Sequence, residues 1–333
     1  MRNTFLLLII IALAGCKNFT SGPAVKLTGA AQGTYYAVTY YDDEQRNFQQ
    51  EIDSLLDAFD MSASVYQPFS VISRINANKS DSTDSIFRKV FSIGMEISEV
   101  TNGAFDMTVM PLVNAWGFGF KDPEKLPEQK VDSLMQYVGY DKIGIENQKI
   151  KKANKHVMID FNAIAQGYSV DLVGKFLEKK GIENYLVDIG GEVLAKGKKP
   201  GLGLWKVGIE KPAENSTSPR SIKAVVSLKN RALATSGNYR KYYVKDGVRY
   251  SHTINPKTGY PVEHFMLSAS VMARSAVTAD AYATAFMVMG LEKAKKFLSQ
   301  QDDLEAYFIF TSPEGVMRTY ISPGMRRFMD VEE

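Results

Sequence analysis

The order of helix-like and strand-like segments constrains the fold of this 333-residue chain more than any other feature. Apolar residues recur at helical spacing over 43–60, 85–103, 163–181 and 276–299. The run TYYAVTYY (34–41), which is rich in aromatic and β-branched residues, is typical of a strand. Because strands do not alternate regularly with helices, the order favours an α+β fold over a parallel doubly wound sheet.

Strand-like segments dominate after residue 181, from NYLVDIGG through LWKVGIE and IKAVVSL to AYFIFTS. Asp246-Gly247 lies between two aromatic runs and predicts a β-hairpin. A shorter helix is expected near 128–138, with strands around 141–161. Gly103 and Gly181 mark expected helix ends. The pattern predicts antiparallel or mixed sheets with helices packed on them.

Composition limits the classes of function. The chain is 45% hydrophobic and 23% charged, which describes a globular protein of one large domain or two lobes. Its net charge of +3 indicates no electrostatic binding of nucleic acid. The sequence contains no GxGxxG after a strand, no Walker A motif and no GxSxG elbow. Its three scattered histidines do not suit a His-rich zinc site.

The N-terminus resembles a bacterial lipoprotein signal. Arg2 precedes an apolar run over 5–14, and Leu-Ala-Gly-Cys ends at Cys16, the single cysteine. We expect residues 1–16 to form the signal peptide with a lipidated Cys16, residues 17–24 a tether, and 25–333 the folded domain. The protein would be lipid-anchored to the cell membrane, outside the cytoplasm on the periplasmic side. The alternative is a soluble export signal with a chance cysteine.

Asp280 and Thr284 stand four residues apart in the helix-forming segment TADAYATA. They therefore share one helix face, where a carboxylate and a hydroxyl can bind a hard cation such as Mg²⁺. The alternative is a solvated aspartate near a helix start, with Thr284 packed or bonded to its own helix. Four alanines surround the pair and indicate that a bulky group packs closely there. We expect their small side chains to leave room for a ligand. They are Ala279, Ala281, Ala283 and Ala285.

Three further segments are candidates for ligand contact. In IDFNAIAQG (159–167) a strand is expected to end at Asp160 and a helix to begin around Ala163, a junction that suits phosphate or a metal-bound anion. The alternative is that Asp160 or Asn162 caps that helix. VDIGGEV (187–193) and ATSGNYR (234–240) are predicted as glycine-bearing turns that either approach a ligand or are plain turns.

Taken together and in order, these segments resemble the ApbE-type FAD:protein FMN transferase family over nearly the whole mature chain. The resemblance implies an ApbE-like fold with two lobes around an FAD cleft. The matching stretches are GTYYAVTY (33–40), SVYQPFSVISRIN (64–76), TNGAFDMTVMPLVNAWGFG (101–119), IDFNAIAQGYSVD (159–171), YLVDIGGEV (185–193), ATSGNYRKYY (234–243), SHTINPKTGYPV (251–262) and TADAYATAFMVMG (278–290).

The resemblance implies an exported enzyme that cleaves FAD with Mg²⁺, transfers the FMN moiety to a threonine of a partner protein and releases AMP. Partners would resemble subunits of membrane redox complexes. The implied metal ligands are Asp280, Thr284 and the Ala163 carbonyl. The implied FAD contacts are Gln32, Ser64, Val65, Tyr66, Ala104, Phe105, Asp106, Asp160, Gln166 and Ile254.

Three residues depart from the usual family pattern. Gln32 stands where the family usually has Met, and Asp188 where it often has Asn. Gln166 replaces a Lys, which removes a positive charge near the expected diphosphate.

His252 opens the turn-rich stretch SHTINPKTGYP. We expect it and Ile254 at the rim of the FAD cleft, where His252 contacts phosphate or moves a proton. An inert, hydrogen-bonded core histidine is the alternative. Two other functions remain open from the sequence: hydrolysis of FAD to FMN and AMP, and FAD binding by a lipoprotein without chemistry.

Overall fold

The computed structural model describes residues 22–119, 126–212, 221–238, 242–245, 248–251, 253–263 and 265–332. Its centre is an eight-stranded sheet in the order β1-β2-β5-β6-β9-β12-β13-β14, in which neighbouring strands run antiparallel. Its strands are β1 (Val25–Ala31), β2 (Thr34–Tyr40), β5 (Tyr185–Ile189), β6 (Glu192–Lys196), β9 (Arg231–Gly237), β12 (Met266–Ala273), β13 (Glu305–Thr311) and β14 (Met317–Ile321).

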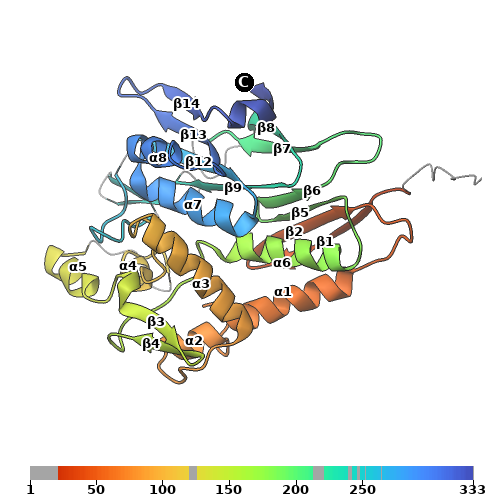
Figure 1. Cartoon of the computed structure of the whole chain (residues 1–333). Coiled ribbons are helices and arrows are strands. Elements are labelled where there is room, and N and C mark those ends of the chain that lie inside the picture. The colour runs from red at the N-terminus through yellow and green to blue at the C-terminus, as the bar shows by residue number, and fades with distance from the viewer. Residues whose placement is uncertain are drawn as a thin grey trace, which may run out of the picture.

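Helices cover one face of this sheet (Figure 1). Helix α6 (Ala165–Lys179) packs on β5 and β6, and α7 (Ala276–Met289) packs on β9 and β12. Helix α1 (Gln49–Ala63) packs on α6, and α3 (Ser85–Val100) contacts α7. The largest apolar cluster lies between these helices and the sheet and includes many fully buried aromatic rings, among them Phe59, Phe87, Phe161, Phe286 and Phe308.

A three-stranded sheet, β15-β8-β7, covers part of the other face. Its strands are β7 (Trp205–Glu210), β8 (Ile222–Leu228) and β15 (Met329–Glu332), and the 3-10 turn η2 (Met325–Phe328) precedes β15. Trp205 and Val226 from this sheet pack with Tyr307 and Met272 from the long sheet. The long sheet is therefore buried on both faces where the smaller sheet covers it.

A helical lobe lies at one end of the molecule, with its own apolar cluster around Trp116 (Figure 1). The Trp116 Nε1–H donates to the carbonyl of Gly259 at 2.8 Å, which joins this lobe to the turn after residue 254. Its elements and neighbours are α2 (Val71–Asn76), α4 (Met110–Ala115), α5 (Glu128–Met135), the 3-10 turn η1 (Tyr140–Lys142), β3 (Ile143–Glu146) and β4 (Lys149–Lys152).

The α+β fold and most predicted elements are confirmed. The expected strand at 34–41 is β2, and the expected hairpin is β10 (Tyr242–Lys245) paired with β11 (Val248–Ser251). The helix predicted over 276–299 is two helices, because Gly290 at φ 74° ends α7 before α8 (Leu291–Leu298). In the part of the chain that the structure describes, no helix has the length and apolarity to span a bilayer.

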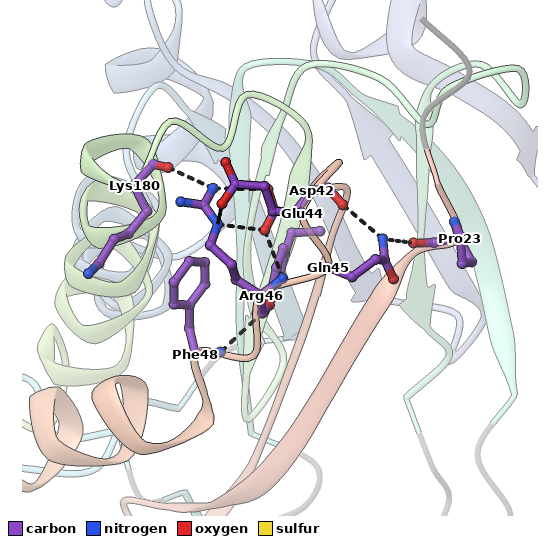
Figure 2. A network of polar contacts seen from close by, with 8 residues as sticks. Pro23, Asp42, Glu44, Gln45, Arg46, Phe48 and Lys180 are labelled. Atoms are coloured by element: carbon purple, nitrogen blue, oxygen red, sulfur yellow. Dashed lines mark hydrogen bonds and ion pairs between the residues drawn. The ribbon is translucent and has the colours of Figure 1, made fainter.

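Helix α1 begins at Gln49, six residues after the predicted start at 43, because Arg46 is held in a loop. The Asp42 carboxylate accepts from the Arg46 backbone N–H at 2.9 Å and from its Nε at 2.8 Å. Arg46 Nη2 also donates to the Lys180 carbonyl at 3.1 Å, just past the end of α6 (Figure 2). These contacts stabilise a loop conformation that competes with the helix.

Candidate active site

Helices α6 and α7 cross at Gly167, where their backbones come close together. A Cβ atom at this position would overlap the Ala276 carbonyl oxygen and lie 2.7 Å from the Cβ of Asp280. The Gly167 N–H donates to Asp280 Oδ2 at 2.9 Å. Gly167 is the third residue of α6, so its N–H has no partner within the helix. A carboxylate from α7 therefore caps α6.

Asp280 is buried, with 7% of its surface exposed, so the expected alternative of a solvated aspartate is wrong. Burial raises the pKa of Asp280 above its usual range, and the charge of Asp171 raises it further, against the hydrogen bond from Gly167, which lowers it. Thr284 follows one turn later on the same helix. Its Oγ1 lies 3.2 Å from the Oγ of Ser236 on β9. The pair thus faces α6 and β9 rather than open solvent.

The alanines around this pair serve a different purpose from the one predicted. Each of the four is fully buried in the main apolar cluster. Their small side chains let α7 lie close to β9, β12 and α6. The bulky neighbours that the sequence indicated are these packed elements of the protein. The expected room for a ligand beside the alanines is therefore absent.

The turn before α6 carries the third predicted metal ligand, Ala163. The first hydrogen-bonded carbonyl of the helix is that of Ile164, which accepts from the Tyr168 N–H at 3.0 Å. The Ala163 carbonyl precedes it and lies outside this ladder. The expected capping of α6 by Asp160 or Asn162 is wrong, because the N-cap residue is Ile164 and Asp160 Oδ1 accepts instead from the Asn162 N–H at 2.8 Å.

These oxygens fit a hard divalent cation. Asp280 supplies a buried carboxylate, Thr284 a hydroxyl, and the Ala163 turn a backbone carbonyl. Magnesium prefers such oxygen donors and uses few of them from the protein. Among the described residues no group of three or more His, Cys, Asp or Glu side chains is placed to hold a metal ion.

Tyr66 joins the α1–α2 loop to the turn at Asp160. Tyr66 is 63% exposed, and its pKa is raised by partial burial and then by the Asp160 charge, while a hydrogen bond with Asn162 lowers it. Burial also raises the pKa of Asp160. Nearby, the Ser64 carbonyl accepts from Ser70 Oγ at 2.7 Å, and Val65 lines a cavity of about 210 Å³. The structure thus brings Tyr66 of the predicted 64–66 segment to Asp160.

The 104–106 segment is linked to the same turn, since the Asp160 N–H donates to the Met107 carbonyl at 2.8 Å. Ala104, Phe105 and Asp106 are buried. The Asp106 carboxylate accepts from the Thr108 N–H at 2.7 Å and from the Tyr140 N–H at 2.9 Å. Burial raises the pKa of Asp106 despite these bonds. Its side chain therefore orders the loop.

Ala104 also lines a larger cavity of about 410 Å³, together with Asn255 and Lys257. Ile254, expected at the rim of the cleft, is only 5% exposed and packs in the Trp116 cluster. Its side chain is thus part of the helical lobe, and its neighbour Asn255 reaches the cavity.

Of the two glutamines that depart from the family pattern, Gln32 lies beside the first half of α6 and Gln166 is the second residue of that helix. Gln32 is in the β1–β2 turn with φ 52°, and its Nε2 donates to the Ser169 Oγ at 2.5 Å. Gln166 lies against the β5–β6 turn, where a Cβ at Gly190 would overlap its Nε2. The predicted turn at Gly190 and Gly191 is confirmed, because Ile189 pairs with Glu192 across it.

Predicted residues Cys16 and His252 lie outside the described residues. The predicted turn at 234–240 is wrong over its first part, because β9 continues to Gly237 and directs Ser236 toward Thr284. Ser236, Gly167 and Asp171 were not predicted as site residues. The four-residue spacing of Gly167 and Asp171 was the one available signal, and it is common in helices.

Comparisons with known proteins agree with the α+β fold. Residues 32–308 match the family described as the ApbE family. An FAD:protein FMN transferase of Haemophilus influenzae is 36% identical over 338 residues, covering 97% of this chain and 96% of that protein. The structure of the flavin transferase ApbE from Vibrio cholerae superposes with a TM-score of 0.81 at 33% identity, covering 92% of this chain and 100% of that one. The apo flavinyl transferase ApbE of Pseudomonas stutzeri gives a TM-score of 0.82 at 30% identity, covering 93% and 98%.

Proposed function

Because this chain belongs to the ApbE family, we propose that it is an FAD:protein FMN transferase that modifies a threonine of a protein acceptor. The threonine oxygen forms a bond to the phosphorus on the FMN side of the FAD diphosphate. The phosphorus–oxygen bond to AMP breaks, AMP leaves, and FMN stays attached through a phosphoester. The acceptor is a subunit of a membrane redox complex.

The junction of α6 and α7 carries this proposal, because it presents oxygen donors at a helix N-terminus. Asp280, Thr284 and the Ala163 carbonyl would hold Mg²⁺. When bound, the cation would withdraw charge from the diphosphate oxygens. The positive end of the helix dipole at the start of α6 favours the same anionic group. Burial of Asp280 keeps its charge poorly screened by water, so its attraction for a cation is stronger than at the surface.

Residues around this junction would bind and orient the two substrates. Tyr66 and Asp160 lie together beside the Ala163 turn and would contact FAD. Gln166 would donate a hydrogen bond to the dinucleotide but supplies no charge, so FAD binding would depend more on the cation and the helix. His252 would accept the threonine proton, since an imidazole titrates near neutral pH.

The test is a mass measurement on a candidate acceptor incubated with FAD and Mg²⁺. The wild-type protein is expected to add one FMN moiety to the acceptor and release an equal amount of AMP. Asp280→Ala should lower the rate by roughly two to three orders of magnitude, and His252→Ala by roughly a hundredfold. Asp303→Ala is the control, because it removes an exposed carboxylate that pairs with Arg274.

The same assay separates the other two functions. Free FMN and AMP without a mass gain on any acceptor would identify an FAD pyrophosphatase. Intact FAD after incubation, with FAD bound to the protein, would identify a non-catalytic flavin-binding protein. Turnover that is unchanged in Asp280→Ala would contradict the proposed cation site.

We also propose that the protein is exported and anchored by lipid at Cys16, with its folded domain outside the cytoplasm. The support is the lipobox-like Leu-Ala-Gly-Cys sequence and the short stretch between Cys16 and the first strand at Val25.

A further inference from the structure

A second buried carboxylate, Asp171, connects the same two helices. Asp171 lies on α6, one turn after Gly167. Its Oδ1 accepts from the Ala276 N–H and its Oδ2 from the Val277 N–H, both at 2.9 Å. Ala276 and Val277 are the first two residues of α7, whose N–H groups have no partner within the helix. Both oxygens of Asp171 are thus bonded to the start of the helix that carries Asp280.

The two carboxylates form a reciprocal arrangement. Asp280 of α7 caps α6 at Gly167, and Asp171 of α6 caps α7 at Ala276 and Val277. Gly167 and Asp171 are four residues apart on one helix, as are Ala276 and Asp280 on the other, so the contacts are one turn apart on each. Two contacts separated in this way fix both the sliding and the rotation of α7 on α6.

This arrangement is costly for a cap. Burial raises the pKa of Asp171 to about 6, because a carboxylate removed from water is costly to ionise. The charge of Asp171 also acts unfavourably on Asp280. Serine caps α7 as well, since Ser275 Oγ accepts from the Thr278 N–H at 3.4 Å. A neutral cap was therefore possible, and the stability of α7 alone does not explain a buried carboxylate.

We propose that Asp171 is a positioning residue of the cation site: by holding the first N–H groups of α7, it sets the rotation at which the Asp280 and Thr284 oxygens face the turn at Ala163. Asp171 itself does not contact the cation. This inference rests on the proposed function, because it takes those three residues as the cation ligands.

The test measures binding of Mn²⁺ alone, by electron paramagnetic resonance, and compares wild type with Asp171→Asn. Asparagine keeps the size but has one acceptor oxygen, so one N–H of α7 loses its partner. We expect Mn²⁺ affinity to fall by about tenfold to a hundredfold, the range typical of residues that orient metal ligands. In turnover assays, the Mg²⁺ concentration at half-maximal rate should rise by a similar factor, while the rate at saturating Mg²⁺ recovers most of its value.

Asp84→Asn is the matched control. Asp84 Oδ1 caps α3 through the Phe87 N–H at 2.8 Å and accepts from Ser62 Oγ at 2.8 Å, so asparagine can keep both bonds while it removes a carboxylate charge outside the α6–α7 junction. Its Mn²⁺ affinity should equal that of wild type. If both asparagine variants weaken Mn²⁺ binding equally, the loss of a carboxylate charge explains the effect and the positioning role is wrong.

A second variant, Ala276→Pro, keeps the carboxylate of Asp171 but removes one donor to it, and the proline Cδ atom in place of that hydrogen forces the carboxylate away from the start of α7. Proline is favoured at the first position of a helix, and the preceding Ser275 already has the extended conformation that proline requires, with φ −124° and ψ 150°. We expect the same loss of Mn²⁺ affinity. If Asp171→Asn does not fold, this variant decides the question alone.

Asp280→Ala separates the two proposals. Loss of Mn²⁺ binding in Asp280→Ala, with wild-type binding in Asp171→Asn and Ala276→Pro, would overturn the role of Asp171 only. Wild-type Mn²⁺ binding in Asp280→Ala would overturn the cation site, and with it the function proposed above.

Discussion

At the scale of single residues, Gly167 permits the contact on which the site depends. Its conformation is an ordinary helical one, so the requirement for glycine is steric: any side chain would meet the Ala276 backbone and Asp280. Gly174, two turns later on α6, is also tightly packed, but a Cβ there would meet side-chain atoms, Leu194 Cδ2 at 2.7 Å and the Tyr185 hydroxyl at 2.8 Å. Side-chain ends move more easily than backbone.

Gly167→Ala should therefore lower the free energy of unfolding by about 1–3 kcal/mol, the usual cost of overpacking, and weaken Mn²⁺ binding. Urea denaturation and Mn²⁺ titration measure the two effects. Gly174→Ala is the control, because it brings the same gain in helix propensity on the same helix with neighbours that can adjust. Equal stability of the two variants would contradict the proposed backbone clash.

At the scale of elements, the junction of α6 and α7 lowers the stability of the fold but fixes how the two helices are placed relative to each other. Two carboxylates, Asp171 and Asp280, are buried between these helices. Helix pairs of this kind usually meet through apolar side chains, and the α6–α7 contact is completed by the buried alanines of α7. The carboxylates add directional bonds that apolar packing lacks, and burial of their charge opposes folding.

The stability of the protein should depend on pH through Asp171. Burial raises the pKa of Asp171 from 3.8 to about 6, so the folded state binds more protons than the unfolded state between these values. The slope of the unfolding free energy with pH is then negative, and stability falls as pH rises from about 4 to about 6, by at most about 3 kcal/mol. Asp171→Asn should make this fall smaller, as measured by urea denaturation across the range, while Asp280, Asp160 and Asp106, whose pKa values burial also raises, keep their own contributions.

The control for this pH series is again Asp84→Asn, which should keep the wild-type slope because it leaves Asp171 intact. A slope that is the same in wild type and Asp171→Asn would contradict the buried ionisation of Asp171.

At the scale of the whole molecule, α6 connects the predicted site to the start of the folded domain. Its first turn meets Asp280, and the Lys180 carbonyl after its last turn accepts from Arg46. The adjacent Gln45 Nε2 donates to the Pro23 carbonyl at 2.9 Å (Figure 2). Fifteen helical residues at 1.5 Å each give a separation of roughly 22 Å. The first described residues thus lie near the end of α6 that is far from the candidate site.

Cys16→Ser should move the protein from the membrane fraction to the soluble fraction, because the lipid attachment would be lost. Binding of FAD and Mn²⁺ should stay at wild-type values, since the candidate site lies within the described domain. Fractionation of cells followed by immunoblotting measures the first effect. Ser21→Ala, a change in the expected tether, is the control, and retention of Cys16→Ser on membranes would contradict the lipid anchor.

Local patterns predicted the parts of the structure that depend on local physics. Helical spacing identified the helices that became α1, α3, α6 and α7, and β-branched and aromatic runs identified β2 and β13. The spacing of Asp280 and Thr284 placed them on one helix face before any partner was known. The start of α1 was predicted too early, because the contact of Arg46 with Lys180 spans 134 positions.

The amino-acid sequence by itself determined the α+β class, the main helices and strands, and the pairing of Asp280 with Thr284, because each depends on residues within a few positions of one another. Only the tertiary structure decided that Asp280 caps α6 and that Asp171 caps α7. Gly167 and Asp280 are separated by 113 positions, and Asp171 and Ala276 by 105. Such bonds form only where packing brings two helix ends together, and no local spacing encodes which ends will meet.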